Sequence, residues 1–355
     1  MEKKKVVVGM SGGVDSSVAA YLLKEQGYEV IGVTMQLWQG ENTSSEDGCC
    51  GLLAVEDARR VAEMLEIPYY VMNFKREFQK SVVDYFVAEY CAGRTPNPCI
   101  ACNRYIKWEA LLSRSLAIGA DYIATGHYAR VEKLSNGRYS IRRAATAEKD
   151  QTYALYNLTQ DQLSHTLFPL GDYEKTEVRR IAEKIGLKVA HKPDSQEICF
   201  VPDQDYAGFI ERSIGNSIPE GNFVTPEGQV IGKHKGIIHY TIGQRKGLKL
   251  SVGYPVFVLA IRPETNEVVI GDGSKVYSEC VLADRLNYMS EATIYDGMRA
   301  VGKIRYNHKG ALCRLYQREK DVLECVFDEP QRAVTPGQAL VLYNGEHVLA
   351  GGTII

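Results

Sequence analysis

Short apolar runs alternate with amphipathic stretches through the first part of the chain. Lys5 to Gly9 is a continuous apolar run of strand length, as expected for a strand covered on both faces by helices. Val14, Val18 and Leu22 then recur at helical spacing, and Gly27 is a helix stop. The same patterns predict strands at 30–37, 69–74 and 122–125 and helices at 52–66, 75–91 and 103–116. This alternation predicts an α/β fold with a doubly wound parallel sheet.

The pattern changes after about residue 205. Helical spacing gives way to apolar alternation punctuated by glycine, as in GYPVFVLAI, NEVVIG, ALCRLYQ, DVLECVF and QALVLYN. Short strands at this spacing predict small β domains. We therefore expect an α/β domain at 1–205, a small central β-containing domain at 206–275 and a C-terminal β-barrel at 276–355.

Length and charge support several domains and one local basic surface. A chain of 355 residues exceeds the usual size of a single core. The net charge is only −2, but Gly228 to Pro263 contains six Lys or Arg and no Asp or Glu. Such a stretch either binds a polyanion or forms a solvated face.

The first residues of the sequence do not show the pattern of a signal peptide. The opening lysines precede only five apolar residues, too few for a signal peptide, and the longest apolar run cannot span a bilayer. We therefore expect a cytoplasmic protein with no membrane partner. In that compartment the nine cysteines are more typical of buried, metal-bound or catalytic thiols than of disulfides.

The stretch GMSGGVDSS, residues 9–17, lies between the first predicted strand and helix. A glycine-rich turn there presents backbone N–H groups and the positive end of the helix dipole to phosphate. The stretch is neither a Walker A loop, which ends in Gly-Lys-Ser/Thr, nor GxGxxG. It instead resembles the PP-loop of ATP pyrophosphatases, which cleave ATP between the α and β phosphates. A tight turn with capping serines would explain the glycines alone.

Three cysteines, in two parts of the chain, stand out. Cys99 and Cys102 form a CxxC in a proline-rich loop before a predicted helix, where the dipole favours a thiolate. Cys199 closes a polar stretch that begins at Asp194. Adjacent Cys49 and Cys50 are a poor chelating pair, and their role stays open. We expect packing roles for the remaining cysteines, which are Cys91, Cys280, Cys313 and Cys325.

An adenylating loop combined with reactive thiols suggests activation of a carbonyl oxygen followed by its replacement with sulfur. The motifs GMSGGVDSS, GRTPNPxxxCN, GADYIATGHYAR, KDQTY, DSQEICF, TIGQRKGL, FDEP, TPGQ and LYNGE occur in this order from about residue 5 to the C-terminus. In that order they resemble the tRNA-specific 2-thiouridylases, the MnmA family.

The resemblance implies specific site residues. The implied ATP-binding positions are Gly9, Met10, Ser11, Gly12, Gly13, Val14, Asp15, Ser16, Met35 and Gly126. Cys199 matches the cysteine that carries a persulfide, and Cys102 matches its partner. The implied tRNA-binding positions are Asn97, Pro98, Cys99, His127, Lys149, Asp150, Gln151, Arg305, Tyr306 and Gln338. Without the family, His127 would be read as a loop histidine and Arg305 as a surface charge.

The reaction implied by the resemblance uses ATP and Mg²⁺. The wobble uridine of tRNAs for lysine, glutamate and glutamine is adenylated at O2, and sulfur then replaces that oxygen to give 2-thiouridine, AMP and pyrophosphate. The base must leave its stack to react, and the protein is expected to hold the anticodon arm. The implied sulfur donor is a cysteine desulfurase or a sulfur-relay protein.

Cys99 departs from the pattern of better-known members, which carry Asp at that position. This leaves the general base unassigned. Cys99, Cys102 and Cys199 together could ligate a [4Fe-4S] cluster with one open iron, as in related thiolation enzymes. The cluster and the persulfide route both remain open here, as do the identity of the sulfur donor and the oligomeric state.

Two other functions compete with this interpretation. Another PP-loop enzyme, such as an amidotransferase or an argininosuccinate-forming ligase, would need no CxxC with a distant third cysteine. A non-catalytic RNA-binding module would release no pyrophosphate from ATP.

Overall fold

The computed structural model describes residues 3–38, 52–193, 198–201 and 203–355. The chain forms two compact units. The first unit comprises Met1–Val82, Cys99–Pro202 and Glu346–Val348; the second comprises Val83–Pro98, Asp203–Gly345 and Leu349–Ile355. Among the described residues, no helix has the length and apolar character needed to cross a membrane.

A five-stranded sheet forms the centre of the first unit, and every strand pairing in it is parallel. Val6, Val7 and Val8 on its middle strand are fully buried, as the apolar run predicts. In spatial order the strands are β3 (Tyr69–Asn73), β2 (Glu29–Gln36), β1 (Lys5–Gly9), β4 (Tyr122–Ala124) and β7 (Thr166–Leu167). The predicted doubly wound parallel sheet is confirmed.

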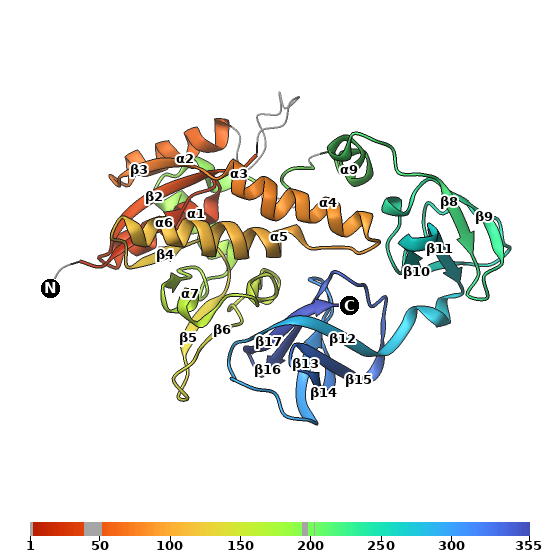
Figure 1. Ribbon diagram of the computed structural model, residues 1–355. Helices are drawn as coiled ribbons and strands as arrows, with labels where there is room; N and C mark the ends of the chain where they lie inside the picture. Colours follow the sequence, from red (N-terminus) through yellow and green to blue (C-terminus); the bar gives the residue numbers. More distant parts are fainter. Residues whose placement is uncertain (1–2, 39–51, 194–197, 202) are drawn as a thin grey trace. The chain divides into compact units, whose positions relative to one another are not determined.

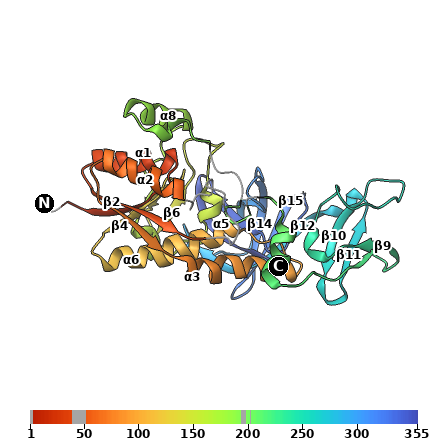
Figure 2. The ribbon, with the colours of Figure 1, turned by 90° about the horizontal axis from the view of Figure 1, so that it is seen from above.

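Helices cover both faces of this sheet (Figure 2). On one side lie α1 (Val14–Glu25), α2 (Leu52–Met64) and α8 (Lys175–Lys184). On the other side lie α3 (Lys75–Phe78) and a continuous helical run formed by α5 (Pro98–Ala101), a π-helical segment (Cys102–Leu111) and α6 (Leu112–Ala117). Helix α1 ends before Gly27, whose φ of +87° is easily adopted only by glycine.

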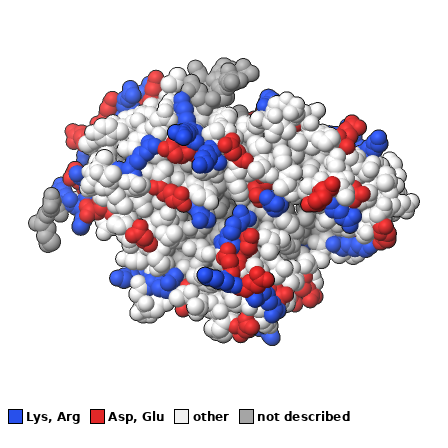
Figure 3. All heavy atoms as spheres, viewed as in Figure 1, with Lys and Arg blue, Asp and Glu red and all other residues white. Residues whose placement is uncertain are grey.

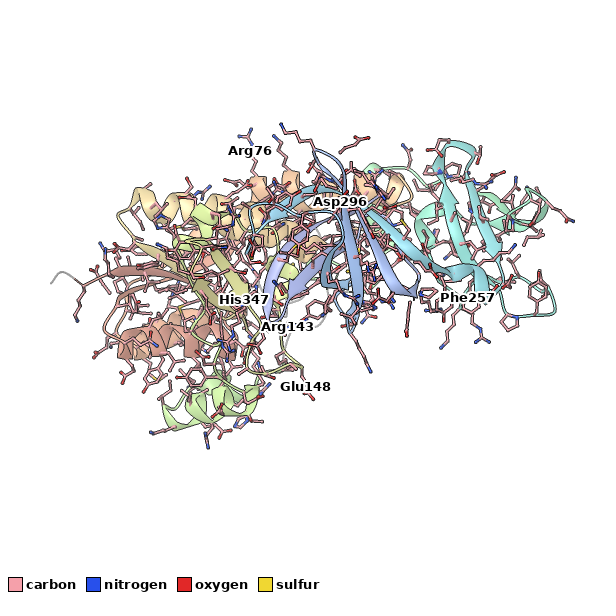
Figure 4. The ribbon with its side chains drawn as sticks, turned by 90° about the horizontal axis from the view of Figure 1, so that it is seen from below. Arg76, Arg143, Glu148, Phe257, Asp296 and His347 are labelled. Carbon is pink, nitrogen blue, oxygen red and sulfur yellow. The ribbon has the colours of Figure 1, made fainter. Side chains whose placement is uncertain are left out.

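The first unit also contains an antiparallel hairpin that the sequence patterns did not predict. Strands β5 (Arg130–Lys133) and β6 (Tyr139–Arg142) pair with each other, and Arg142 pairs with His347 at the start of β17 (His347–Ile354). His347 and Arg143 are labelled side by side in Figure 4. Further short elements are a 3₁₀ turn (Thr152–Leu155), α7 (Gln160–Ser164) and a 3₁₀ turn (Lys188–His191).

The second unit begins with helical segments. A π-helical turn (Gln79–Val83) leads from α3 into α4 (Asp84–Cys91), and α9 (Tyr206–Ile214) starts the later part of the chain. Helix α9 lies where we expected helices to give way to strands. Its ends have ordinary signals, because the Asp205 side chain accepts a hydrogen bond from Gly208 N at 3.0 Å and Gly215 has a φ of +70°.

A small four-stranded sheet follows α9 (Figure 1). Its spatial order is β10 (Phe257–Arg262), β11 (Glu267–Gly271), β8 (Gly221–Val224) and β9 (Val230–His234). The β11–β8 pairing is parallel, whereas the other two are antiparallel. Three 3₁₀ turns connect the strands, at Ile237–His239, Pro263–Thr265 and Gly273–Val276.

The last six strands close into a β-barrel, as predicted. Their order is β12 (Tyr277–Tyr288), β15 (Val322–Arg332), β14 (Ala311–Glu319), β13 (Met298–Lys303), β16 (Ala339–Asn344) and β17, and pairing of β12 with β17 completes the circle. Closure leaves the barrel without a free edge strand. Leu315, Leu340, Leu342 and Leu349 are fully buried in its core.

The barrel confirms a packing role for two cysteines and refutes it for a third. Cys313 and Cys325 are fully buried in the core. Cys280 is exposed, and its thiol donates to Glu324 Oε1 at 3.3 Å. Loss of solvation, and then this carboxylate, raise the pKa of Cys280 to about 11. The prediction was wrong because Cys280 is on the outer face of β12, next to inward-facing Val281. Cys91 is half-buried.

Candidate active site

The stretch 9–17 lies at the carboxyl end of β1, where the strand order reverses. Strand β2 lies on one side of β1 and β4 on the other, so their connections leave toward opposite faces of the sheet. Ligands of open α/β sheets bind in the crevice at such a point. The predicted nucleotide loop therefore occupies the position that the topology favours.

The loop holds its shape through its own serines and one constrained glycine. Ser11 N donates to Ser16 Oγ at 3.1 Å, and Ser16 Oγ donates to Gly13 O at 3.2 Å. Gly12 has a φ of +70°, and a Cβ there would lie 2.3 Å from Ala54 O. Helix α1 starts after Gly13 with no side-chain cap, so the amides of its first turn are available to an anion.

Two distant segments meet this loop. Gly126 follows β4, and a Cβ on it would lie 2.7 Å from Ser16 N and 2.8 Å from the carbonyl carbon of Asp15. Met35 is half-buried near the carboxyl end of β2, where the neighbouring Thr34 Oγ1 donates to Met10 O at 2.8 Å. The ATP-binding positions predicted from three parts of the sequence thus gather at one edge of the sheet.

Asp15 has partners that sequence reasoning missed. Lys175 Nζ lies 2.8 Å from each carboxylate oxygen of Asp15, and Tyr128 Oη donates to Asp15 Oδ1 at 2.7 Å. A second lysine reaches the same loop, since Lys192 Nζ donates to Gly12 O at 3.3 Å. The loop sequence lacks a lysine, and the folded chain supplies two from a segment about 160 positions away.

His127 lies in a largely aromatic environment beside this loop. Its ring centre is 5.7 Å from that of Trp108 and 6.0 Å from that of Phe168. Its Nε2 faces Lys107 Nζ at 3.4 Å, and its Nδ1 lies 2.6 Å from Thr125 Oγ1. Because an ammonium group only donates, Nε2 accepts and the ring proton belongs on Nδ1. Burial, and then the charge of Lys107, hold the pKa of His127 well below its ordinary value.

The KDQTY motif, residues 149–153, forms hydrogen bonds with the backbone of Tyr128, the residue after His127. Gln151 Oε1 accepts from Tyr128 N at 2.9 Å, and Gln151 N donates to Tyr128 O at 3.0 Å. The Asp150 carboxylate accepts from Ala144 N and from the Thr152 hydroxyl. The side chains of Asp150 and Gln151, which the resemblance assigns to tRNA contacts, thus also make contacts within the protein.

The three candidate thiols all lie in the first unit. Cys99 is exposed in the first turn of the helical run, and half-buried Cys102 begins its π-helical segment, a geometry often found at functional sites. Cys199 is exposed on a short turn closed by Val201 N and Ile198 O at 2.9 Å. Buried Phe200 anchors this turn, with its ring centre 5.7 Å from that of Phe78 and 6.5 Å from that of Trp38.

The described residues contain no preformed group of metal ligands. Within residues 3–38, 52–193, 198–201 and 203–355, no three His, Cys, Asp or Glu side chains are arranged to hold a metal ion. The three-cysteine [4Fe-4S] site predicted for Cys99, Cys102 and Cys199 is therefore not seen in this part of the chain. Cys49 and Cys50 lie outside the described residues.

Of the remaining predicted tRNA positions, Lys149 lies in the first unit, and the others lie in the second unit, where two of them line one pocket. This pocket has a volume of about 270 Å³, and Arg305, Gln338 and Arg332 contribute to it together with the loop at 241–243. Arg305 Nη1 donates to Arg332 O at 2.8 Å, and Gln338 Nε2 donates to Thr95 O at 2.7 Å.

Other groups complete this polar surface. The Arg332 guanidinium lies 5.5 Å from the ring centre of Phe257, which is labelled in Figure 4. Tyr306 is 40% exposed, and Asn97 is half-buried. Basic and acidic side chains are intermingled on the face shown in Figure 3, so that face presents mixed charge.

Family models cover nearly the whole chain. The tRNA methyl transferase HUP domain matches residues 4–203, and the tRNA methyl transferase PRC-barrel domain matches residues 207–272. The aminomethyltransferase beta-barrel domain matches residues 278–354.

Individual relatives carry a different name from these models. The chain is 65% identical over 355 residues to a tRNA-specific 2-thiouridylase MnmA of Lachnoclostridium phytofermentans, covering 99% of each chain. It is 54% identical to the protein of that name in Clostridioides difficile, covering 99% of this chain and 98% of the relative.

A 4-thiouridine synthetase solved with RNA and ATP is also similar to this chain. The identity is 18%, with 60% of this chain and 50% of that one covered and a TM-score of 0.34. The two full-length relatives, which are named as thiolation enzymes, match 99% of this chain at 65% and 54% identity, whereas each domain model matches only a part of it. The chain belongs to the family of tRNA-specific 2-thiouridylases.

Proposed function

We propose that this enzyme uses ATP to place sulfur at C2 of the wobble uridine in tRNAs for lysine, glutamate and glutamine. The observation that carries the proposal is the meeting of the 9–16 loop, the start of α1 and Gly126 at the strand-order reversal. Uncapped amides and a helix N-terminus suit the pyrophosphate of ATP. The tRNA substrate would make the cytoplasm its place of action.

The first step is adenylation. Uridine O2 attacks the α phosphate, the bond to the β phosphate breaks, and pyrophosphate leaves. Asp15 is a partly exposed carboxylate in this loop and suits Mg²⁺, which prefers oxygen ligands alongside phosphate oxygens. Bound Mg²⁺ would neutralise charge on the pyrophosphate. The loop amides would hold the phosphates in line for the attack.

The second step transfers sulfur. A cysteine desulfurase or sulfur-relay protein leaves a persulfide on Cys199, whose exposure suits delivery by another protein. The outer sulfur attacks C2, and AMP leaves with the former O2. The Cys102 thiolate then attacks the Cys199 sulfur and breaks the S–S bond. The products are 2-thiouridine and a Cys102–Cys199 disulfide, which an external dithiol must reduce before the next turnover.

The tRNA contacts are divided between the units in this proposal. His127 and the segment 149–151 would face the reacting nucleotide from the first unit. The pocket lined by Arg305 and Gln338 has the guanidinium groups and hydroxyls that suit a ribose-phosphate of the anticodon arm. We propose that the catalytic domain spans residues 1–205, the central tRNA-binding domain spans residues 206–275 and the C-terminal β-barrel spans residues 276–355.

The Cys199→Ser variant tests this scheme against its rivals. It should release pyrophosphate from ATP in the presence of unmodified tRNA but form no 2-thiouridine, as measured by mass spectrometry of tRNA digests. Cys280→Ser, which removes another exposed thiol, should keep both activities. An amidotransferase or ligase would keep its product in Cys199→Ser, and an RNA-binding module would release no pyrophosphate.

Iron content tests the sulfur route. The protein purified without oxygen should be colourless, free of iron and active with a persulfide donor. A brown protein that contains iron in proportion to its activity would overturn the persulfide route.

A further inference from the structure

The contact between Lys175 and Asp15 links two helices at the edge of the nucleotide loop. Asp15 is in the first turn of α1, and Lys175 is the first residue of α8, which lies on the same side of the sheet (Figure 2). Both carboxylate oxygens are 2.8 Å from Lys175 Nζ. The Lys175 side chain is only 13% exposed, so solvent screens the pair weakly.

Lys175 is unfavourably placed for its own helix. The N-terminus of an α-helix carries partial positive charge and stabilises anions, whereas cations are favoured at the other end. Helix α8 follows this rule elsewhere, since Glu174 and Glu177 form a capping box and Lys184 lies in the last turn. A partly buried ammonium at the first position of α8 adds to the positive potential that the amides of α1 already present.

Lys192 places a second ammonium beside the loop, at Gly12. Its Nζ lies 3.3 Å from Gly12 O and 3.0 Å from Asp57 Oδ2. The two lysines therefore flank a loop whose sequence lacks the lysine that a Walker A motif provides. In each case a carboxylate holds the ammonium close to the place where phosphates would bind.

We propose that Lys175 and Lys192 are the phosphate-binding cations of this loop, and that Lys175 moves from Asp15 to the departing pyrophosphate. The inference rests on the proposed adenylation. In the nucleotide-free protein, Asp15 and Tyr128 hold Lys175 in position. When Lys175 turns to the β phosphate, it neutralises charge that grows as the α–β bond breaks, and the carboxylate it leaves becomes available to Mg²⁺. Charge is conserved, because the Lys175 ammonium exchanges one anionic partner for another.

Lys175→Met is the informative variant, with Lys184→Met on the exposed last turn of the same helix as its control. Pyrophosphate release is measured with full-length protein, ATP, Mg²⁺ and unmodified tRNA. We expect kcat to fall about 10²- to 10³-fold in Lys175→Met, the usual effect of removing one group that stabilises developing negative charge. Lys175→Arg should recover part of this loss, and Lys184→Met should match the wild type.

The Mg²⁺ dependence separates this role from a structural one. Removing Lys175 removes the competitor for Asp15, so the Mg²⁺ concentration for half-maximal rate should fall in Lys175→Met. A variant that merely loosens the fold would not bind Mg²⁺ more tightly. Thermal melting checks that Lys175→Met is folded, and Lys175→Gln, which also removes the ammonium charge, supplies the same comparison if it is not.

Two results would overturn the proposed role of Lys175, and they can be told apart. Equal kcat and equal Mg²⁺ dependence in Lys175→Met and Lys184→Met would overturn the inference while leaving the proposed function intact. If the wild type released no pyrophosphate with tRNA, the proposed function would fail and this inference with it.

Discussion

The contact between Gly126 and the nucleotide loop predicts a large catalytic effect from one added methyl group. In Gly126→Ala, the new Cβ would lie 2.7 Å from Ser16 N, whereas ordinary contact begins at 3.4 Å. The neighbouring atoms all belong to Asp15 and Ser16, and two of the three are backbone atoms. The loop and the strand end must therefore separate by about 0.7 Å, the difference between those two distances.

Two magnitudes follow from this displacement. Overpacking of a well-packed site costs about 1–3 kcal/mol of folding free energy. A shift approaching 1 Å in the position of reacting groups costs up to about 10²-fold in rate. We therefore expect Gly126→Ala to remain folded while pyrophosphate release with ATP and tRNA falls by about 10- to 100-fold.

Gly137→Ala is the matched control for this experiment. Gly137 has a φ of +83° and open space around the position of a Cβ, so alanine there introduces backbone strain without a clash. It should lower the melting temperature through a cost of about 1–2 kcal/mol and leave the rate unchanged. If Gly126→Ala released pyrophosphate at the wild-type rate with an unchanged KM for ATP, the loop would not be the nucleotide site and the reasoning would be refuted.

Three further predictions concern His127, Phe200 and Glu132. His127 should stay neutral at pH 6, with its proton on Nδ1, as measured by ¹⁵N-resolved NMR. Because the unfolded chain takes up a proton at a pKa of about 6.5 and the folded site resists it, the free energy of unfolding should decline as the pH falls below that value. A normal titration midpoint for His127 would contradict this prediction. Phe200→Ala removes the buried anchor of the Cys199 turn, at a cost of about 3–5 kcal/mol where packing is complete. The formation of 2-thiouridine should therefore fall while pyrophosphate release persists. Equal losses of both activities would disprove an anchoring role specific to sulfur transfer. Arg142, and then His347, hold the pKa of Glu132 below its ordinary value, so the contribution of Glu132 to stability is present above about pH 4.5 and is lost at lower pH. Glu132→Gln should therefore flatten the acid side of a plot of melting temperature against pH. An unchanged plot would rule this out.

Local patterns predicted the elements that carry the site. The apolar run before Gly9, the helical spacing of Val14, Val18 and Leu22, and the stop at Gly27 each depend on neighbours within one element. The strands and helices that were predicted in the parallel domain were correct to within a few residues for the same reason, whereas β7 and α8 were not predicted. The outward position of Cys280 was also available from the alternation of β12, and we misassigned it by treating an amphipathic context as packing.

Local patterns of this kind could not predict contacts between residues far apart in the chain. Tyr128 and Lys175 meet Asp15 across more than 110 positions, and Gln151 holds the backbone of Tyr128. No periodicity encodes these contacts, because each depends on which strands become neighbours and on how far the helices between them carry the chain.

The sequence by itself determined the alternation of strands and helices, the glycine-rich turn after the first strand and the family to which the chain belongs. Those features arise from side-chain periodicity, glycine conformations and short motifs, all of which are local. Tertiary structure alone decided that two lysines flank a loop that has none, and that β12 and β17 close the barrel. Both depend on packing between segments far apart in the chain, where burial and charge pairing act only after the fold has brought them together.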